Sequence, residues 1–200
     1  LGAINTAAES LVPDIVSELF KTYPNIHCHI KSALSLQLFS EVQHDELDVA
    51  ICLHPEFGLP KTLAWQTLRE ERMVLFVPKE LSAHEPHELL KTQPFIRFDR
   101  KQWGGQQVEH YLRKANIVPR ERLEISHLTV IVALVSRGVG VALAPDTALP
   151  SSVSNKIARL TLPLATKPRQ LGILWQRASS HGKLIDLFVR QAMTLCQASG

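Results

Sequence analysis

Polar side chains that could bind a small ligand follow four short apolar segments of the sequence. Each group stands where an apolar segment, predicted to be a strand, passes into a predicted helix. The backbone N–H groups at such a junction are unpaired and favour an anion, and hydroxyl groups or a guanidinium can add hydrogen bonds. The candidate ligand-binding residues are Asn5, Thr6, Ser32, Ser35, Arg97, Phe98, Trp103, Gly104, His127 and Thr129.

Several of these residues also have an interpretation that involves no ligand. A serine or threonine at a helix start often only caps the helix, which contributes about 1 kcal/mol, and Ser32 and Thr129 fit that role as well. Arg97 alternates with its apolar neighbours in "PFIRF", so it is either a bidentate clamp for a carboxylate or a solvated residue at a strand end. Trp103 is either an aromatic wall of the pocket or a loop anchor that packs on the domain.

Motifs for catalysis and for metal binding are missing from the sequence. It contains no Gly-x-Ser-x-Gly elbow and no Walker loop, and "RGVGVALA" lacks the third glycine of a dinucleotide-binding turn and precedes a strand. The pairs His27 with His29 and His84 with His87 have no third ligand at a recognisable spacing. We therefore predict no catalytic residue, no enzymatic activity, no metal and no cofactor.

The composition indicates an ordinary soluble globular protein. The 200 residues are 45% hydrophobic and 20% charged, enough for one large domain or two small ones. The three cysteines are far apart and odd in number, which favours a reducing, cytoplasmic location over a disulfide framework. No apolar run is long enough to span a membrane, and "LGAINTAAES" lacks the features of a signal peptide. The net charge of +3 is dispersed, so this chain itself has weak support for binding nucleic acid.

The first quarter of the chain alternates predicted strands and helices. The strands are "LGAIN", "IHCHIK" and "LDVAICL", and Pro13 marks a kink or a second helix start in the first helix. The second helix begins near Ser32 or Ser35. This β-α-β-α-β order implies right-handed crossovers and a parallel sheet with helices on its faces.

The same kind of pattern begins again after "RMVLFVPKE" and predicts a second doubly wound sheet. "PFIRF" and "RLEIS" are predicted strands, the latter with Leu123 and Ile125 facing inward, and Gly104 and Gly105 open the helix between them. In "VIVALVSRGVGVALAPD" a helix ends at Gly138 in the left-handed conformation, and Gly140 keeps one position of the next strand small. Ligands of open α/β sheets bind beyond the carboxyl ends of the strands, so we expect a ligand cleft between two hinged halves.

Four segments in this order resemble the effector-binding domain of LysR-type transcriptional regulators, across essentially the whole chain. They are "LGAINTAAESLVPDIVSELFKTYPNIHCHI", "ELDVAI", "PFIRF" and "LVSRGVGVALAP". The resemblance implies an α/β, periplasmic-binding-protein-like (type II) fold with two Rossmann-like subdomains and two crossing hinge strands, mapped onto "RMVLFVPK" and "QLGILWQR". Subdomain I is then residues 1–74 plus 177–200 and subdomain II residues 75–176, and the winged helix-turn-helix DNA-binding domain is absent from this chain.

The resemblance also implies a function for the chain. It would sense a small-molecule effector, a small carboxylate or an aromatic molecule, and change the geometry of a homodimer or homotetramer that reaches DNA only through the missing domain. Thr6, Ser32, Phe98 and Thr129 match positions that commonly line the family's pocket, and residues 10–23 and 26–30 would lie near the partner subunit. The alternative with the same architecture is a periplasmic solute-binding protein for a small anionic solute.

One residue departs from the family pattern. Asp45 in "HDELDVAI" stands where the family usually has a glycine at a helix end. Aspartate tolerates the left-handed conformation better than most residues, so we expect the turn to survive.

Overall fold

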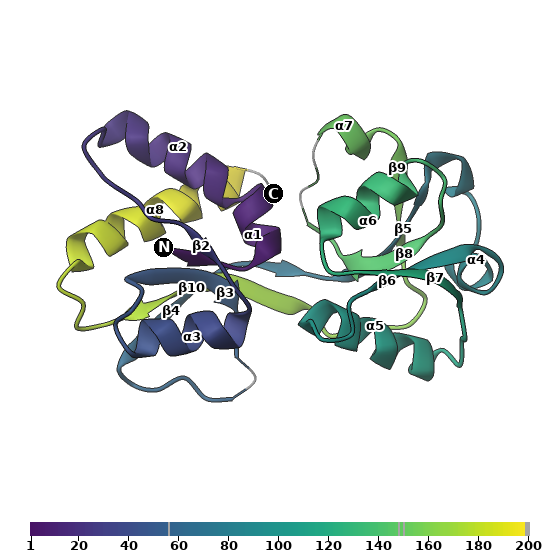
Figure 1. Cartoon of the computed structure of the whole chain (residues 1–200), viewed down its shortest axis with the longest axis horizontal. Coiled ribbons are helices and arrows are strands. Elements are labelled where there is room, and N and C mark those ends of the chain that lie inside the picture. The colour runs from purple at the N-terminus through teal and green to yellow at the C-terminus, as the bar shows by residue number, and fades with distance from the viewer. Residues whose placement is uncertain (56, 148, 150, 199–200) are drawn as a thin grey trace. The chain divides into compact units, whose positions relative to one another are not determined.

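The computed structural model describes residues 1–55, 57–147, 149 and 151–198, which form two compact units (Figure 1). The first unit is Leu1–Glu70 with Arg169–Gly200, and the second is Glu71–Pro168. The sequence placed these boundaries later, inside two hinge strands. The corresponding strands are β5 (Met73–Pro78), which lies in the second unit, and β10 (Arg169–Gln176), which lies in the first, so the chain changes unit ahead of each strand.

The first unit is built on a five-stranded sheet with the order β2-β1-β3-β10-β4. β1 (Gly2–Ala3) pairs in parallel with β2 (Lys31–Ser32) and β3 (Val49–Leu53), whereas β10 runs antiparallel to β3 with Leu171 opposite Leu53. The start of β10 therefore lies at the same sheet edge as the carboxyl ends of β1, β2 and β3. The outer strand is β4 (Leu63–Glu71).

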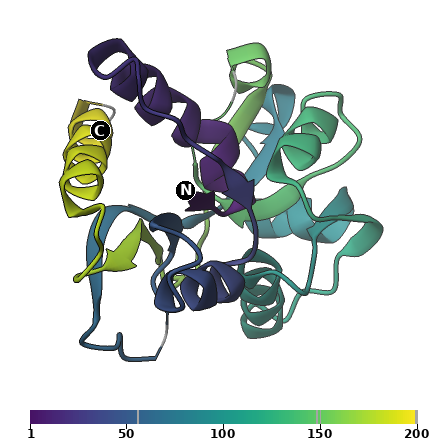
Figure 2. The same ribbon diagram turned by 60° about the vertical axis from the view of Figure 1, so that its left-hand side comes forward.

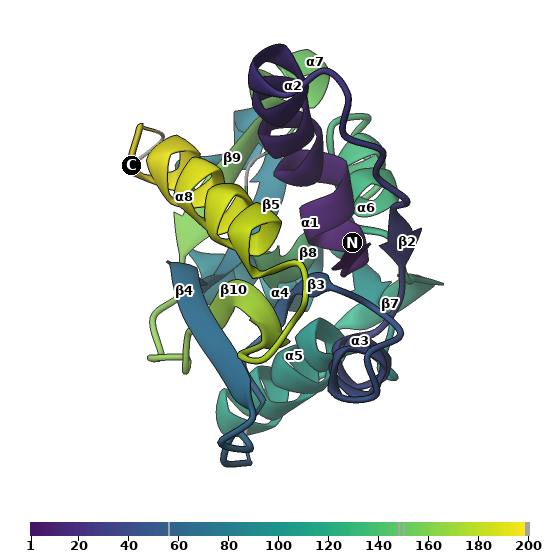
Figure 3. The same ribbon diagram turned by 90° about the vertical axis from the view of Figure 1, so that its left-hand side faces the viewer.

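Helices cover both faces of this sheet. Figures 1 and 2 show α3 (Ser35–Gln43) on the face opposite α2 (Val12–Thr22), and Figure 3 shows α8 (Gly182–Ala198) on the same face as α2. α1 (Asn5–Ser10) precedes α2, and Pro13 lies in the first turn of α2, so of the two interpretations the second helix start is correct. Proline suits this position because its missing N–H would be unpaired there.

Two strand predictions for the first unit were incomplete. The strand predicted over "IHCHIK" is wrong for residues 26–30, because β1 is only two residues long and pairs with β2 at Lys31 and Ser32 alone. β4 was not predicted from the sequence, because its residues are mostly half-buried and show no clean apolar alternation.

The second unit has a central strand with antiparallel neighbours, unlike the doubly wound sheet that the sequence predicted. β5 lies between β8 (Ala142–Pro145) and β9 (Ile157–Thr161), both antiparallel to it. β6 (Pro94–Phe98) and β7 (Arg120–Ile125) form a parallel pair, which a bridge from Phe95 to Val141 joins to the segment entering β8. The parallel arrangement holds for β6, β7 and β8, and β5 departs from it.

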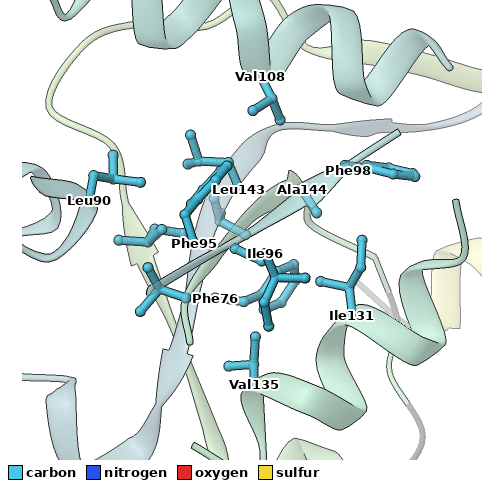
Figure 4. Close-up of a cluster of buried hydrophobic side chains, with 14 of the residues drawn as sticks. Phe76, Leu90, Phe95, Ile96, Phe98, Val108, Ile131, Val135, Leu143 and Ala144 are labelled. Carbon is cyan, nitrogen blue, oxygen red and sulfur yellow. The ribbon is translucent and has the colours of Figure 1, made fainter. Parts of the chain in front are cut away.

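The core of the second unit lies between two helices. In Figure 4, Val108 of α5 (Trp103–Lys114) and Ile131 and Val135 of α6 (Leu128–Val135) lie on opposite sides of the strand residues. The strand residues between them include Phe76, Phe95, Ile96 and Leu143, all fully buried. Three shorter helical segments, η1 (Lys79–Leu81), α4 (Pro86–Thr92) and α7 (Ser151–Ser154), complete the unit.

Two turn predictions and one prediction of a small residue are confirmed. Gly138 follows α6 with φ +73°, and Asp45 adopts φ 62° after α3, the left-handed conformation expected there. A Cβ atom added at Gly140 would lie 2.3 Å from the carbonyl oxygen of Pro94, which explains the small residue. The inward orientation expected for Leu123 is wrong, because β7 is an edge strand and leaves this side chain 40% exposed.

Candidate functional site

The carboxyl edge of the first sheet brings Thr6 and Arg169 together. Thr6 lies in the first turn of α1 and is 9% exposed, and Arg169 is the first residue of β10 and is 5% exposed. Arg169 Nη2 donates a hydrogen bond to Thr6 Oγ1 over 3.2 Å, although the two residues are 163 positions apart in the sequence. A buried hydroxyl is thus held next to a buried positive charge.

Ser35 lies at the same edge, one strand away. It is the first residue of α3, and its Oγ accepts a hydrogen bond from the backbone N–H of Leu53 at the end of β3 (3.2 Å). Ser32 lies within β2 and is exposed, and Asn5 begins α1 and is partly buried. The N-cap of α3 is Leu34, which offers no capping side chain, so the capping interpretation of Ser32 is wrong.

Arg169 is a residue of this edge that was not among the residues predicted from the sequence. Its signal was an arginine standing directly before the apolar strand "QLGILW". In a purely parallel sheet, only residues that follow strands reach this edge. Because β10 runs antiparallel to β3, its first residue lies where the parallel strands end.

The second unit has a comparable edge where β6 and β7 end. The backbone N–H of Asp99 donates to the carbonyl of Ile125 (3.0 Å), and the Gln102 side-chain amide donates to the carbonyl of Ser126 (2.7 Å). These bonds place the loop that leads into α5 beside the segment that leads into α6. They therefore bring the predicted residues of the two segments, 97–104 and 127–129, to one edge.

The predicted residues of this edge differ in exposure. His127 is exposed and is the N-cap of α6, Thr129 is a half-buried residue of the first turn, and no side chain caps this helix, so the capping interpretation of Thr129 is wrong. Phe98 is 2% exposed, and a Cβ atom at Gly104 would lie 2.5 Å from its ring. Phe98 and Gly104 therefore pack against each other, while the half-buried Trp103 begins α5.

A family model described as the LysR substrate binding domain matches residues 1–197. The chain belongs to the LysR substrate-binding domain family. Among curated relatives, it is 27% identical over 194 residues to the transcriptional activator IlvY of Haemophilus influenzae and 27% identical over 192 residues to the regulator YybE of Bacillus subtilis. The matches cover 92% and 94% of the chain but 64% of each relative, so the chain spans about two thirds of the length of these relatives or slightly less.

Solved structures of an effector-binding domain and a regulatory domain share the fold. The effector-binding domain of QuiR in complex with shikimate has a TM-score of 0.73 at 17% identity, covering 98% of this chain and 95% of that one. The regulatory domain of CcmR from Synechocystis PCC6803 in complex with 2-PG has a TM-score of 0.74 at 17% identity, with the same coverage. The predicted α/β, type II periplasmic-binding-protein-like fold with two Rossmann-like subdomains is thereby confirmed.

Arg97 of this LysR domain is buried, unlike a solvated strand-end residue. It is 1% exposed, and its guanidinium pairs with Glu109 of α5 and, at 3.6 Å, with Glu121 of β7. Its Nε has no hydrogen-bond partner among the described residues. The solvated interpretation is therefore wrong, and the guanidinium is already occupied by carboxylates of its own unit.

A second arginine extends this charged group to the surface. Arg100 pairs with Glu121 (2.7 Å) and with Glu124, and its backbone N–H donates to the Glu124 carboxylate. These contacts lower the pKa of Glu124 and raise that of Arg100. The network joins β6, β7 and α5 below the candidate edge.

The remaining reactive side chains include histidines and cysteines of the part of the chain that the structure describes. There, no group of three or more His, Cys, Asp or Glu residues could hold a metal ion. His87 Nε2 lies 2.7 Å from the Tyr111 hydroxyl. Burial raises the pKa of the Cys52 thiol to about 12. None of the helices over the described residues is both long and apolar enough to cross a membrane.

Proposed function

We propose that this chain is the ligand-sensing domain of a LysR-type transcriptional regulator, and that it binds a small carboxylate or an aromatic effector. The observation that carries the proposal is the match of the LysR substrate binding domain over residues 1–197. The structures of the QuiR and CcmR domains hold shikimate and 2-PG, which supports a small-molecule ligand for this domain as well. The proposal assigns the chain no catalytic step.

The predicted residues divide into those that contact the effector and those that support them. In this proposal, hydroxyl, amide and imidazole groups at the two sheet edges contact the effector directly, together with one aromatic side chain. These residues are Asn5, Thr6, Ser32, Ser35, His127, Thr129 and Trp103. Phe98 and Gly104 shape the second edge by packing, and Arg97 holds β6 to α5 and β7.

The effector acts on the rest of the regulator through the conformation of this domain. A ligand shifts an equilibrium between two arrangements only by its difference in affinity for them. We propose that the regulator is a cytoplasmic homodimer or homotetramer, in which residues 10–23 and 26–30 lie near the partner subunit. A separate N-terminal domain contacts DNA, and the effector changes the spacing of these domains.

A thermal-shift screen followed by site variants tests this function. A panel of small carboxylates and uncharged aromatic molecules should contain a compound that raises Tm, because a ligand that binds the folded state stabilises it. Ser35→Ala and Thr129→Val should each reduce that shift, whereas Ser82→Ala, an exposed serine of the second unit, should not. The same compound should change DNA binding by the intact regulator. Chemical conversion of the compound, or unchanged DNA binding, would contradict the proposal.

A further inference from the structure

The outer edge of the first sheet is formed by β4, which has a strand on one side only. The strand order β2-β1-β3-β10-β4 leaves β10 as the one strand beside it among the described residues (Figure 3). β4 is nine residues long, and its residues 63–68 include no charge, no proline and no glycine. A long strand of this composition with an unpaired edge is a template on which another strand can add.

The pairing with β10 determines which backbone groups of β4 face outward. The backbone N–H of Arg177, just after β10, donates to the carbonyl of Thr62, just before β4 (2.9 Å). Thr62 therefore faces β10. The backbone groups of successive strand residues point to opposite sides, so the outward residues are every second one, namely Leu63, Trp65 and Thr67. An incoming antiparallel strand would form its hydrogen bonds at these positions.

Side chains already occupy two of the outward carbonyls. The guanidinium Nε of Arg177 donates to the carbonyl of Leu63 over 3.0 Å. The side-chain amide of Gln66 donates to the carbonyl of Thr67, also over 3.0 Å. The covered positions lie on either side of Trp65. Along the uncharged segment, an incoming strand therefore meets no two neighbouring outward positions with open carbonyls.

Displacing these side chains is unfavourable for an incoming strand. Both hydrogen bonds are partly buried, and a strand that replaced them would exchange one hydrogen bond for another with little net gain. Arg177 also places a positive charge at this edge, a common device for preventing strand addition. The opposite edge of the sheet is protected differently, because β2 has only two residues and a very short strand is a poor template.

We propose that Gln66 and Arg177 close the outer edge of the first sheet to strand addition, so that copies of this chain do not associate through β4. The two side chains act by covering backbone carbonyls, and Arg177 is itself exposed and contributes little to the core. The proposal does not depend on the effector or on the proposed function.

A peptide with the sequence of β4, LAWQTLREE, tests whether the edge is closed. Fluorescence anisotropy of the labelled peptide measures its affinity for the chain, which should be low for the original. The double variant Gln66→Ala/Arg177→Ala opens both carbonyls and should bind the peptide about tenfold more tightly, because two hydrogen bonds no longer have to be displaced. Hydrogen exchange should show that the bound peptide protects the amides of Trp65 and Thr67.

The matched control removes the same two kinds of donor elsewhere in the chain. The Gln176 amide donates to the carbonyl of Gln43, and the Arg137 guanidinium donates to the carbonyl of Ala133. Neither carbonyl belongs to β4. The variant Gln176→Ala/Arg137→Ala also loses one amide and one positive charge, and it should bind the peptide like the original chain.

Three results would overturn the proposal: equal peptide affinity of the original chain and the double variant, an equal gain in the control variant, or protection confined to amides outside β4. If the double variant does not fold, Gln66→Ala and Gln176→Ala form the comparison, since Gln66→Ala changes no charge and opens one carbonyl. Gln66→Ala should then bind the peptide about threefold more tightly than Gln176→Ala. Equal affinities of these two variants would also contradict the closed edge.

Discussion

The guanidinium of Arg97 on β6 pairs with the carboxylate of Glu109 on the helix that follows, α5. Arg97 is 1% exposed while the Glu109 side chain is 45% exposed, so the two ends of the ion pair lie in different surroundings. A buried charge that loses its partner is strongly destabilising, whereas an exposed charge is solvated by water. The stability of the second unit therefore depends on the carboxylate more than its exposure suggests.

Glu109→Ala should lower the free energy of unfolding by about 2 kcal/mol, because it leaves Arg97 buried with fewer partners. Urea denaturation measures this change. Gln106→Ala, an exposed position on the same helix, has the same gain in helix propensity and should leave stability within about 0.5 kcal/mol of the original. Equal effects of the two substitutions would mean that Arg97 does not need this carboxylate.

Gly140→Ala should destabilise the second unit by about 2 kcal/mol or more, because the new Cβ would lie 2.3 Å from the backbone carbonyl of Pro94. The Val141 backbone N–H donates to this same carbonyl (2.9 Å), so neither segment can move aside without losing that hydrogen bond. Gly182→Ala is the matched control, since an added Cβ there meets nothing within 4 Å. Thermal unfolding of the two variants compares them directly, and a tolerated alanine at Gly140 would contradict the packing described.

Asp45→Gly should stabilise the first unit by up to about 1 kcal/mol, since Asp45 has φ 62° and glycine adopts this conformation without a steric cost. Asp45→Ala should instead be destabilising, because alanine meets the same steric cost without the local hydrogen bonding of aspartate. The order Gly, Asp, Ala in the midpoint of urea unfolding is the expected result. A glycine variant no more stable than the original would show that the aspartate side chain makes a compensating contact.

The Cys52 thiol should make folding sensitive to alkaline pH. Its pKa rises from an ordinary value near 9 to about 12 because burial disfavours the thiolate. A raised folded-state pKa means that the stabilising effect is complete below pH 9 and is lost as the pH rises toward 12. The stability difference between the original chain and Cys52→Ala should therefore shrink over that range. A difference that stays constant from pH 8 to about 11 would contradict the raised pKa.

Local patterns in the sequence determined much of this protein. Short-range sterics and periodicity can be read directly from the sequence, because they depend only on residues that are close together in it. Examples are the helical spacing of Leu11 to Phe20, the glycines at 138 and 140, and the apolar run that ends at Pro145. The ordered segments also pointed to the LysR domain, which the family match confirms. Asp45 was expected to take the left-handed conformation, and it does.

Tertiary structure decided the features that depend on contacts distant in sequence. Strand direction is one of them: nothing local in "RQLGILWQ" says that β10 runs antiparallel to β3, yet this direction brings Arg169 to Thr6. Another is the burial of Arg97, which the pattern "PFIRF" left open and which the carboxylates of α5 and β7 decided. Periodicity tells which residues share a face of one element, and only the packing of several elements determines what that face meets.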